Sequence, residues 1–516
     1  TPWLARKILR SASDSGNYDV KTTLLYKWYD RLLQPILRSR KNSWLFLALV
    51  AFLFVSAAML PAMRLVPLKL LPYDNKNEFQ LVLNMPERTS FVQTSNVLRD
   101  FSDYLVTVPE VVSVSAFSGV ASPMDFNGMV RHYFMRNLAN QGELRIVLAE
   151  KNRRHQQSHE IVTRLRSDLE HIAAKHSADI QLVEVPPGPP VIATITAEVY
   201  GSETTPYDKL QAQALNVAAR LTREEFVSEV DTSIQGDYET WQFVVDREKA
   251  ALSGVSVYDI NQTISAANKG FVLANLQVER EIEPLPVKVR LPKDNRDNLN
   301  KLLSLYVRGQ QGIVKQVVQG ALLDAPQPLV QLSELGEFVK HNVDQPIYHK
   351  NLKPVVYVYA ESAGRVPGEI IADVLVDFNG ENSEQRIPVS ERSYLNNGAG
   401  DSWSVTEDIE IVWSGEGEWK ITVDVFRDLG IAYGAALLGV FVVMLVQTGL
   451  PAVSGIIMLA IPLTVIGIMP GFWLLNLTGE DINGYPNPSL FTATAMIGMI
   501  ALAGIVVRNS LVLIEF

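Results

Sequence analysis

Apolar residues along the chain gather into four long runs, separated by stretches in which apolar and polar residues alternate. The runs cover residues 43–66, 429–446, 452–475 and 490–516. A membrane core about 30 Å thick needs roughly 20 helical residues, which each run approaches or exceeds. We therefore predict four membrane-spanning helices. With their flanking residues, they occupy residues 43–66, 427–448, 451–476 and 489–516.

The last run carries one charged residue in its interior, Arg508, which is followed by Asn509. An arginine inside a membrane costs at least a few kcal/mol, and such residues often mark ion or substrate pathways. The alternative is an arginine whose side chain snorkels to the lipid headgroups. Residues 511–514 are apolar again, which favours burial of Arg508 within the helix bundle.

Basic residues precede the first run. Arg31, Arg38, Arg40 and Lys41 place this end in the cytoplasm by the positive-inside rule, and the long soluble segment 67–426 then lies outside it. Within residues 1–42 we predict a helix lying on the inner membrane face, with an ordinary linker helix as the alternative. Its apolar side is formed by Leu24, Leu25, Trp28, Leu32 and Leu33.

The soluble segment shows one pattern of strands and helices twice. Residues 67–190 have the order βαββαβ, typical of a ferredoxin-like unit. The predicted strands are 78–85, 111–117, 143–149 and 179–185, and the predicted helices are 90–106 and 158–175.

The pattern restarts after the proline-rich residues 186–190. Three elements come first: a strand at 191–200, a helix that Thr205 caps with Pro206 at its first position, and a strand at 227–234. A long insertion, residues 235–353, follows them. Residues 354–426 complete this unit with a strand, a helix at 367–378 and a strand at 407–413. The fold class is thus a membrane α-helical bundle plus an α+β outer region. Ligand sites tend to lie in the cleft between two such units.

Composition and motifs exclude several functions. The net charge of −10 and the absence of a basic stripe argue against nucleic acid as a partner. The sequence contains no phosphate-binding G-x-x-x-x-G-K-[ST] loop and no G-x-S-x-G elbow, and it has no cysteine. His155 and His159 have a zinc-like spacing, but no glutamate follows His155 as in an H-E-x-x-H motif, so we predict a solvated helix face. We expect no cofactor, no metal and no enzymatic activity.

The connection between the strands at 111–117 and 143–149 is long and rich in bulky apolar residues. Phe117, Met124, Phe126 and Met129 lie in it among glycines and a proline. Long loops of this kind are either packed down or functional. Methionine and phenylalanine suit apolar ligands of varied shape, so this segment is a candidate substrate path. The alternative is that these side chains cover the core of their own unit.

Two segments resemble a known family. Residues 244–260 read VVDREKAALSGVSVYDI, and residues 503–516 read AGIVVRNSLVLIEF. The first is similar to the docking-subdomain signature of the resistance–nodulation–division (RND) multidrug efflux permeases, and the second resembles their tenth membrane helix. The residues that carry the docking motif are Asp246, Lys249, Gly254 and Asp259.

The resemblance implies the C-terminal half of such a permease, with two porter units, an inserted docking subdomain and the seventh to tenth membrane helices. Residues 1–10 then correspond to the end of the sixth helix. The family implies a bacterial inner-membrane homotrimer with its large domain in the periplasm. The implied partners are the N-terminal half of the permease, a periplasmic adaptor, an outer-membrane channel, membrane lipid and amphiphilic substrates.

The implied activity is proton-driven export of drugs, dyes or detergents. The segment 117–129 aligns with the family's gating loop between substrate pockets. Arg508, with Asn509 beside it, stands where the family commonly has lysine. Arginine keeps its proton at any reachable pH, so we expect a fixed partner for carboxylates on other helices rather than a proton carrier.

Two other functions stay open at this stage. One is an RND exporter of another cargo, such as lipid or metal, although the outer region lacks the methionine clusters expected for copper or silver. The other is a membrane-anchored periplasmic binding module without transport. Arg508 and the inserted block count against the binding module, because an anchor needs neither.

Overall fold

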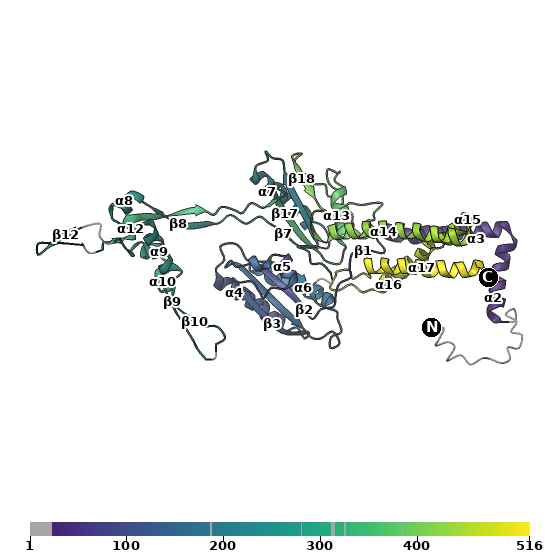
Figure 1. The fold of residues 1–516 in the computed structure, drawn as a ribbon, viewed down its shortest axis with the longest axis horizontal. Coiled ribbons are helices and arrows are strands. Elements are labelled where there is room, and N and C mark those ends of the chain that lie inside the picture. The colour runs from purple at the N-terminus through teal and green to yellow at the C-terminus, as the bar shows by residue number, and fades with distance from the viewer. Residues whose placement is uncertain are drawn as a thin grey trace. The chain divides into compact units, whose positions relative to one another are not determined.

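The computed structural model describes residues 23–515, except 186–187, 280, 311–314, 325–326 and 384. The chain forms two compact parts (Figure 1). Residues 235–346 make up one part, and the other described residues make up the second. The predicted tail of an earlier helix at residues 1–10 and the first residues of the predicted interfacial helix lie outside the described residues.

In the part of the chain that the structure describes, four helical segments are long and apolar enough to cross a membrane. They are α3 (Arg40–Ala62), α14 (Gly417–Thr448), α15 (Pro451–Leu459) continued by α16 (Val465–Leu477), and α17 (Ala493–Glu515). Between α15 and α16 a 3₁₀ turn, η4 (Pro462–Thr464), interrupts the predicted single helix. Proline lacks the N–H that a continuous helix needs at this point.

The start of the fourth apolar run is not helical, so that part of the prediction is wrong. Phe491 and Thr492 form the short strand β19 (Phe491–Thr492), which pairs in parallel with β1 (Leu68–Lys69). The peptide N–H of Ala493 then donates to Leu70 O at 3.0 Å. The first residues of α17 are therefore joined to the beginning of the first soluble unit.

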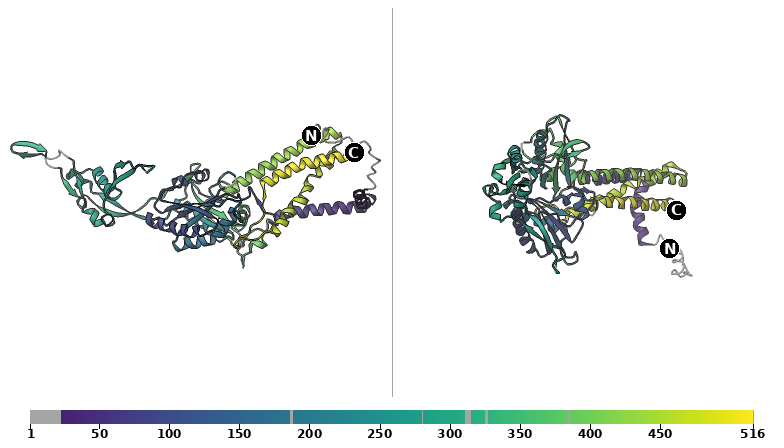
Figure 2. Two further views of the ribbon diagram at one scale, coloured as in Figure 1. Left: turned by 90° about the horizontal axis from the view of Figure 1, so that it is seen from below. Right: turned by 60° about the vertical axis from the view of Figure 1, so that its left-hand side comes forward.

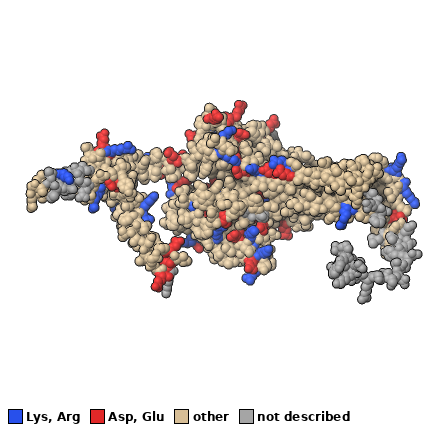
Figure 3. Space-filling model, viewed as in Figure 1, with Lys and Arg blue, Asp and Glu red and all other residues tan. Residues whose placement is uncertain are grey.

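The apolar helices present their side chains outward. α3 packs on α16, and α14 runs beside α15 and α17 (Figures 1 and 2). The surface over α14 and α17 carries few charged groups along most of its length (Figure 3). So many exposed leucine, phenylalanine and valine side chains are expected in contact with lipid rather than with water. Examples are Leu45, Phe52, Ile431, Leu438 and Val443.

Helix α2 (Leu24–Arg38) precedes α3, and the extended residue Ser39 separates the two helices. The Thr23 hydroxyl caps α2 by accepting a hydrogen bond from Tyr26 N at 3.2 Å. Trp28 and Leu37 are exposed on α2, and the helix also carries basic residues (Figure 3). This composition fits the interfacial helix that the sequence predicts, and its place on a membrane stays a prediction.

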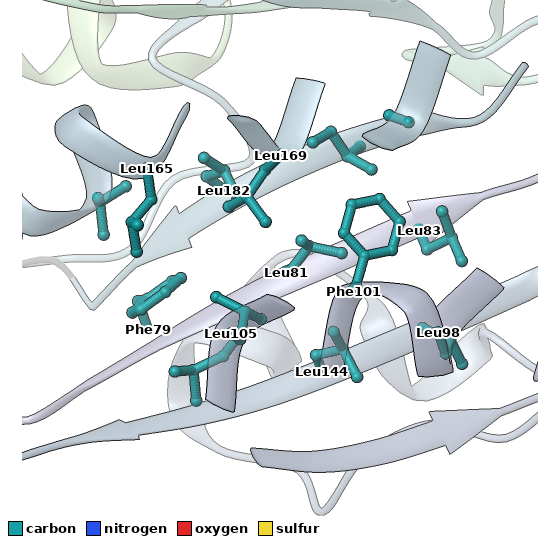
Figure 4. Close-up of a cluster of buried hydrophobic side chains, with 14 of the residues drawn as sticks. Phe79, Leu81, Leu83, Leu98, Phe101, Leu105, Leu144, Leu165, Leu169 and Leu182 are labelled. Atoms are coloured by element: carbon teal, nitrogen blue, oxygen red, sulfur yellow. The ribbon is translucent and has the colours of Figure 1, made fainter. Parts of the chain in front are cut away.

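The first α/β unit is a four-stranded antiparallel sheet in the order β3-β4-β2-β5 with two helices. A capping box between Ser90 and Gln93 starts its first helix, α4. Leucine and phenylalanine side chains from both helices pack on the sheet to form the core (Figure 4). The elements are β2 (Glu78–Asn84), α4 (Phe91–Val106), β3 (Val111–Ser118), β4 (Gln141–Leu148), α6 (Ser158–Lys175) and β5 (Asp179–Glu184), with α5 (Phe126–Val130) and η2 (Tyr133–Met135) between β3 and β4.

Four strands of the second α/β unit repeat this order as β7-β17-β6-β18, and a fifth short strand, β16, also pairs with β17. Its helix α7 begins at Tyr207 with Pro206 as the residue before it, so the predicted cap at Thr205 is wrong. The Thr205 hydroxyl instead donates to Asp408 at 2.8 Å. The elements are β6 (Ile195–Gly201), α7 (Tyr207–Thr222), β7 (Val227–Thr232), β16 (His349–Lys350), β17 (Lys353–Ser362), α13 (Pro367–Val376), η3 (Val389–Glu391) and β18 (Ile409–Val412).

Among its described residues, the inserted part has a small core of its own, with six buried residues around Ile260 and Leu335. A long antiparallel pair, β8 (Glu239–Val245) with β15 (Gly336–Asn342), leads into it and out of it. Side chains of the hairpin β9–β10 are exposed along both strands. The other elements are α8 (Arg247–Leu252), α9 (Val257–Asn268), β9 (Phe271–Leu276), β10 (Leu285–Val289), α10 (Lys293–Arg296), α11 (Leu299–Leu303), β11 (Tyr306–Arg308), β12 (Lys315–Val318), β13 (Ala321–Asp324), β14 (Leu329–Gln331) and α12 (Leu332–Leu335).

We predict that Phe101→Ala lowers the melting temperature of the purified protein markedly. The Phe101 ring on α4 is fully buried against the sheet. Truncating such a ring lowers the free energy of unfolding by about 3–5 kcal/mol. The control is Val112→Ala on β3, where the side chain is 68% exposed. Thermal unfolding followed by intrinsic fluorescence compares the two variants, and equal shifts would contradict the assigned core.

Candidate functional site

The connection between β3 and β4 exposes large apolar side chains. Met124 is 60%, Phe126 64% and Met129 45% exposed, whereas Phe117, at the end of β3, is half-buried. The first three side chains therefore do not cover the core of their own unit. Phe134 and Met135 are exposed in the same connection and extend the apolar surface beyond the residues named from the sequence.

Polar contacts hold the backbone of this connection in place. Arg145 on β4 donates to Asp125 Oδ2 at 2.8 Å, to Ser122 Oγ at 3.1 Å and to Pro123 O at 3.1 Å. Asp125 also accepts from Gly128 N at 2.6 Å and so caps α5. Burial would raise the pKa of Asp125, but these hydrogen bonds and the Arg145 charge hold that pKa below its usual value. The apolar side chains thus project from a fixed backbone.

A cavity of about 130 Å³ lies between the two α/β units. Its wall combines apolar residues with positive and negative groups in similar number, so it has no strong preference for the sign of a ligand. The charged residues in the wall are Lys69, Asp74, Arg131, Arg166, Glu184, Glu361 and Glu418.

A continuous row of contacts runs along one wall of this cavity. The Lys69 ammonium lies 3.6 Å from Glu418 at the start of α14 and 3.8 Å from the centre of the Tyr73 ring. Tyr73 stacks on His159 with ring centroids 3.4 Å apart. His159 Nδ1 lies 2.8 Å from Glu184 on β5. The row joins the first α/β unit to helix α14.

The prediction of a solvated histidine face is wrong for His159. Its side chain is 13% exposed and lines the cavity, because Tyr73 covers it. His155 precedes α6 and so does not share a helix face with it. Within the described residues, no group of three or more histidine, cysteine, aspartate or glutamate side chains is placed to hold a metal ion.

A buried network of ion pairs joins α3 to the second α/β unit. Arg64 follows α3 and donates through both terminal nitrogens to Asp373 on α13, at 2.7 and 3.0 Å. Arg365 and Arg392 each bridge Asp373 and Glu224 with hydrogen bonds of 2.5–3.0 Å. The side chains of Glu224, Asp373 and Arg392 are 0% exposed.

The network extends to the end of α7. Arg220 donates to Glu224 at 2.8 Å and to Asp377 at 2.6 Å. Asp377 also accepts from the peptide N–H groups of Ala399 and Gly400, at 2.9 and 3.1 Å. We call Arg64, Arg220, Glu224, Arg365, Asp373, Asp377 and Arg392 the anchor network.

The anchor network keeps Glu224 and Asp373 ionised, because the guanidinium groups around them lower the pKa of each carboxyl. Burial alone would raise the pKa of Asp373, but the hydrogen bonds from Arg64 and Gly398 N and the charge of Arg365 lower that pKa well below its usual value. Sequence reasoning missed this cluster. Its signal is a charge at every fourth position through and beside the apolar helix α13: Arg365 before it, Glu369 and Asp373 within it, and Asp377 after it.

Arg508 and Asn509 lie on α17 and are exposed in this single chain. Their role as charge partners stays a prediction. In the inserted part, Asp246 caps α8 by accepting from Lys249 N at 3.1 Å. Gly254 has φ 66°, a conformation that favours glycine.

Asp259, the fourth residue of the docking motif, forms a cap with Ser256 at the start of α9. It accepts from the Ser256 hydroxyl at 2.6 Å and donates its peptide N–H to that oxygen at 3.1 Å. The four motif residues thus shape the two short helices locally, and a docking role for them stays a prediction.

Comparison with known proteins gives one consistent result. The sequence profile of the AcrB/AcrD/AcrF family matches residues 1–516. The swarming motility protein SwrC of Bacillus subtilis is 23% identical over 62% of this chain and 25% of its own length. The nickel and cobalt resistance protein CnrA of Cupriavidus metallidurans is 24% identical over 63% of this chain and 26% of its own length.

Solved structures share the fold. A crystal structure of a heavy metal efflux pump superposes with a TM-score of 0.66 at 14% identity, covering 95% of this chain and 44% of that one. The chain spans about a quarter of the length of the curated relatives that it matches.

We predict that Asp373→Asn destabilises the protein at neutral pH. Removing one partner of a buried ion network leaves an uncompensated buried charge, which lowers the free energy of unfolding by about 3–5 kcal/mol. The pKa of Asp373 is depressed, so its contribution is complete above the ordinary value of 3.8 and is lost only as pH falls below it. The difference in melting temperature from wild type should therefore be constant between about pH 5 and 9.

The control for this variant is Glu150→Gln, which removes an exposed pair with Arg153 at 4.0 Å. Surface pairs contribute little, so its melting temperature should match that of wild type. An Asp373→Asn protein that melts like Glu150→Gln would show that the anchor network does not stabilise the fold.

Proposed function

Because the chain belongs to the AcrB/AcrD/AcrF family of RND permeases, we propose that it is part of a membrane exporter driven by the proton gradient. One charge crossing 100 mV releases about 2.3 kcal/mol. Each 1.4 kcal/mol is a tenfold ratio, so one proton sustains about a fifty-fold gradient of cargo. Export by this route needs no nucleotide site.

We propose amphiphilic compounds as the cargo. The observation that carries this proposal is the row of exposed apolar side chains, Met124, Phe126 and Met129, on a backbone fixed by Arg145. Exposed aromatic and thioether groups bind apolar ligands of varied shape. The cavity between the α/β units, with its balanced charge, lies in the same outer region.

Metal cations are the second candidate cargo. The names of CnrA and of the nickel-cobalt-cadmium resistance protein NccA of Alcaligenes xylosoxydans xylosoxydans favour this reading. Against it, the described part of the chain has no cluster of three or more histidine, cysteine, aspartate or glutamate side chains that could hold such an ion.

In the proposed arrangement the α/β units and the inserted part lie in the periplasm, and α2 lies on the cytoplasmic face of the inner membrane. The basic residues near the start of α3 support this orientation. The proposed partners are the rest of the permease, further copies of it in a homotrimer, a periplasmic adaptor and an outer-membrane channel. The inserted part, residues 235–346, is the proposed docking element.

We predict that Phe126→Ala changes which compounds the full-length protein exports while leaving its melting temperature nearly unchanged. The ring is 64% exposed, so its loss removes little packing. Susceptibility of an efflux-deficient strain to dyes, detergents and nickel or cobalt salts measures export. A changed profile for amphiphiles alone supports the proposed cargo, whereas a change for metal salts alone would favour the second candidate.

Arg508→Met should abolish gradient-driven export without preventing membrane insertion. The neutral side chain removes the charge that we propose as a fixed partner for carboxylates on other helices. Arg508→Lys should retain part of the activity because it keeps the charge but loses the planar guanidinium. Wild-type export by the methionine variant at equal expression would show that Arg508 only reaches the headgroups.

A further inference from the structure

The apolar segment between β3 and β4 is fixed to its own α/β unit at both ends. Asp125, before α5, pairs with Arg145 on β4, with Oδ2 and Nη1 2.8 Å apart. Arg136, after η2, donates to a peptide oxygen of β2 at 2.7 Å, and its Nε lies 3.2 Å from Glu143 Oε1 on β4. Residues 126–135 therefore form a loop whose two ends are held by the sheet of the first unit.

The middle of this loop reaches the second unit through Arg131. This residue follows α5 and donates to the Glu361 carboxylate on β17 at 3.3 Å. The two side chains are 10% and 18% exposed, and both line the cavity between the units. A guanidinium group in such a site has lost most of its hydration, so losing its carboxylate partner is unfavourable. The pair therefore ties the end of α5 to β17.

Packing alone holds α5 weakly. Helices much shorter than about 12 residues are not stable by themselves and depend on contacts with the rest of the fold. Two of the five residues of α5 are buried, Asn127 and Gly128, and neither has a large apolar side chain. The contacts at its two ends, from Asp125 and from Arg131, therefore decide where this helix lies.

Backbone geometry beside both partners of the pair is unusual. His132, next to Arg131, has φ 58°, in the left-handed region that is uncommon for residues other than glycine. Such conformations persist where surrounding contacts impose them. The pairing of β17 with β7 shifts register between Tyr359 and Glu361, and irregularities of this kind redirect a side chain. Both partners thus lie where the chain departs from regular geometry.

We propose that Arg131 and Glu361 are a positioning pair for the substrate path: their contact holds α5 against the second α/β unit and so fixes where Phe126 and Met129 meet the cargo. The pair itself does not contact cargo. This inference rests on the proposed function, because it requires amphiphilic compounds to pass along α5.

Other contacts hold the two units together. Arg166 on α6 pairs with Glu229 on β7. Gln181 on β5 donates to Asp231 on β7 at 3.2 Å. Loss of the positioning pair should therefore free the end of α5 while leaving the spacing of the two units nearly unchanged.

The first test measures the position of α5 in the full-length protein in lipid nanodiscs. Spin labels are attached at Met129→Cys on α5 and Ala212→Cys on α7, which are both exposed. Residues 1–516 contain no cysteine, and any cysteine elsewhere is replaced by serine. The pulsed electron–electron distance should be narrow with the pair intact and clearly broader in Arg131→Gln. A second label pair, Ala174→Cys on α6 with Ala212→Cys, measures the spacing of the units and should not change.

Two results of this test would overturn the positioning pair. One is an Arg131→Gln protein in which the distance from α5 to α7 is the same as in wild type. The other is equal broadening for both label pairs, because Arg131 would then hold the two units together rather than hold α5.

A double-mutant cycle tests whether Arg131 acts through Glu361. Glu361→Gln should broaden the α5 distance as Arg131→Gln does, and it remains the decisive variant if Arg131→Gln does not fold. The double variant should match either single variant, because each change removes the same contact. Additive broadening would contradict the proposal. The matched control is Arg164→Gln on α6, whose pair with Glu110 at 2.9 Å lies wholly within the first unit. It should leave both distances unchanged.

Export kinetics distinguish positioning from general damage. The full-length protein is reconstituted in proteoliposomes, and export of an amphiphilic dye is measured. In Arg131→Gln the dye concentration for half-maximal export should rise about three- to tenfold, while the maximal rate stays within about twofold. A mobile α5 binds cargo less well because its binding surface is no longer preorganised, whereas the pair takes no part in the steps driven by the proton gradient. A lower maximal rate at an unchanged half-maximal concentration would contradict the positioning role.

The two measurements together separate this inference from the proposed function. A broader α5 distance with wild-type dye export would show that α5 is not on the path of the cargo, which overturns the proposed amphiphile route. An unchanged α5 distance would overturn the positioning pair alone, whatever the cargo is.

Discussion

The anchor network fixes how the membrane helices and the second α/β unit relate to each other. Glu224 and Asp373 each accept from several guanidinium groups in a site closed to water, and Arg64 brings the end of α3 into the same cluster. The members of a buried network of this kind stay together, because the loss of one member leaves the charges of the others uncompensated. α3, α7 and α13 are therefore expected to move as one body, and displacement of α3 is passed directly to the second unit.

The first α/β unit is attached to the membrane helices by different groups. The pairing of β1 with β19 and the Lys69–Glu418 contact connect it to α17 and α14. The second unit is thus anchored to α3 by the network, whereas both units contact α14. The units meet along β7 and at the Arg131–Glu361 pair, whose nitrogen and oxygen lie 3.3 Å apart.

Hydropathy and periodicity predicted the four spans and the repeated α/β pattern, because burial in lipid or in a core requires apolar residues at regular positions within one segment. These two patterns gave wrong predictions where the structure of a residue depends on a partner far away in the sequence. Phe491 becomes a strand because its partner, Leu68, lies far earlier in the chain, and His159 is covered by Tyr73 from outside its helix. The left-handed backbone at Glu229 has no signature in its own strand. The charges spaced along and beside α13 were readable from the sequence. The role of the loop residues as a substrate path stays a prediction, because cargo depends on side chains rather than on the shared fold.

The pairing of β1 with β19 has a mechanical consequence. Successive residues of a strand are about 3.3 Å apart, so α17 cannot slide along its axis by one residue without breaking or shifting this pairing. Arg508 lies fifteen residues beyond Ala493, about 22 Å further along a rigid helix. A force that acts on the Arg508 charge along the axis of α17 is therefore transmitted by this helix to the first residues of the first α/β unit.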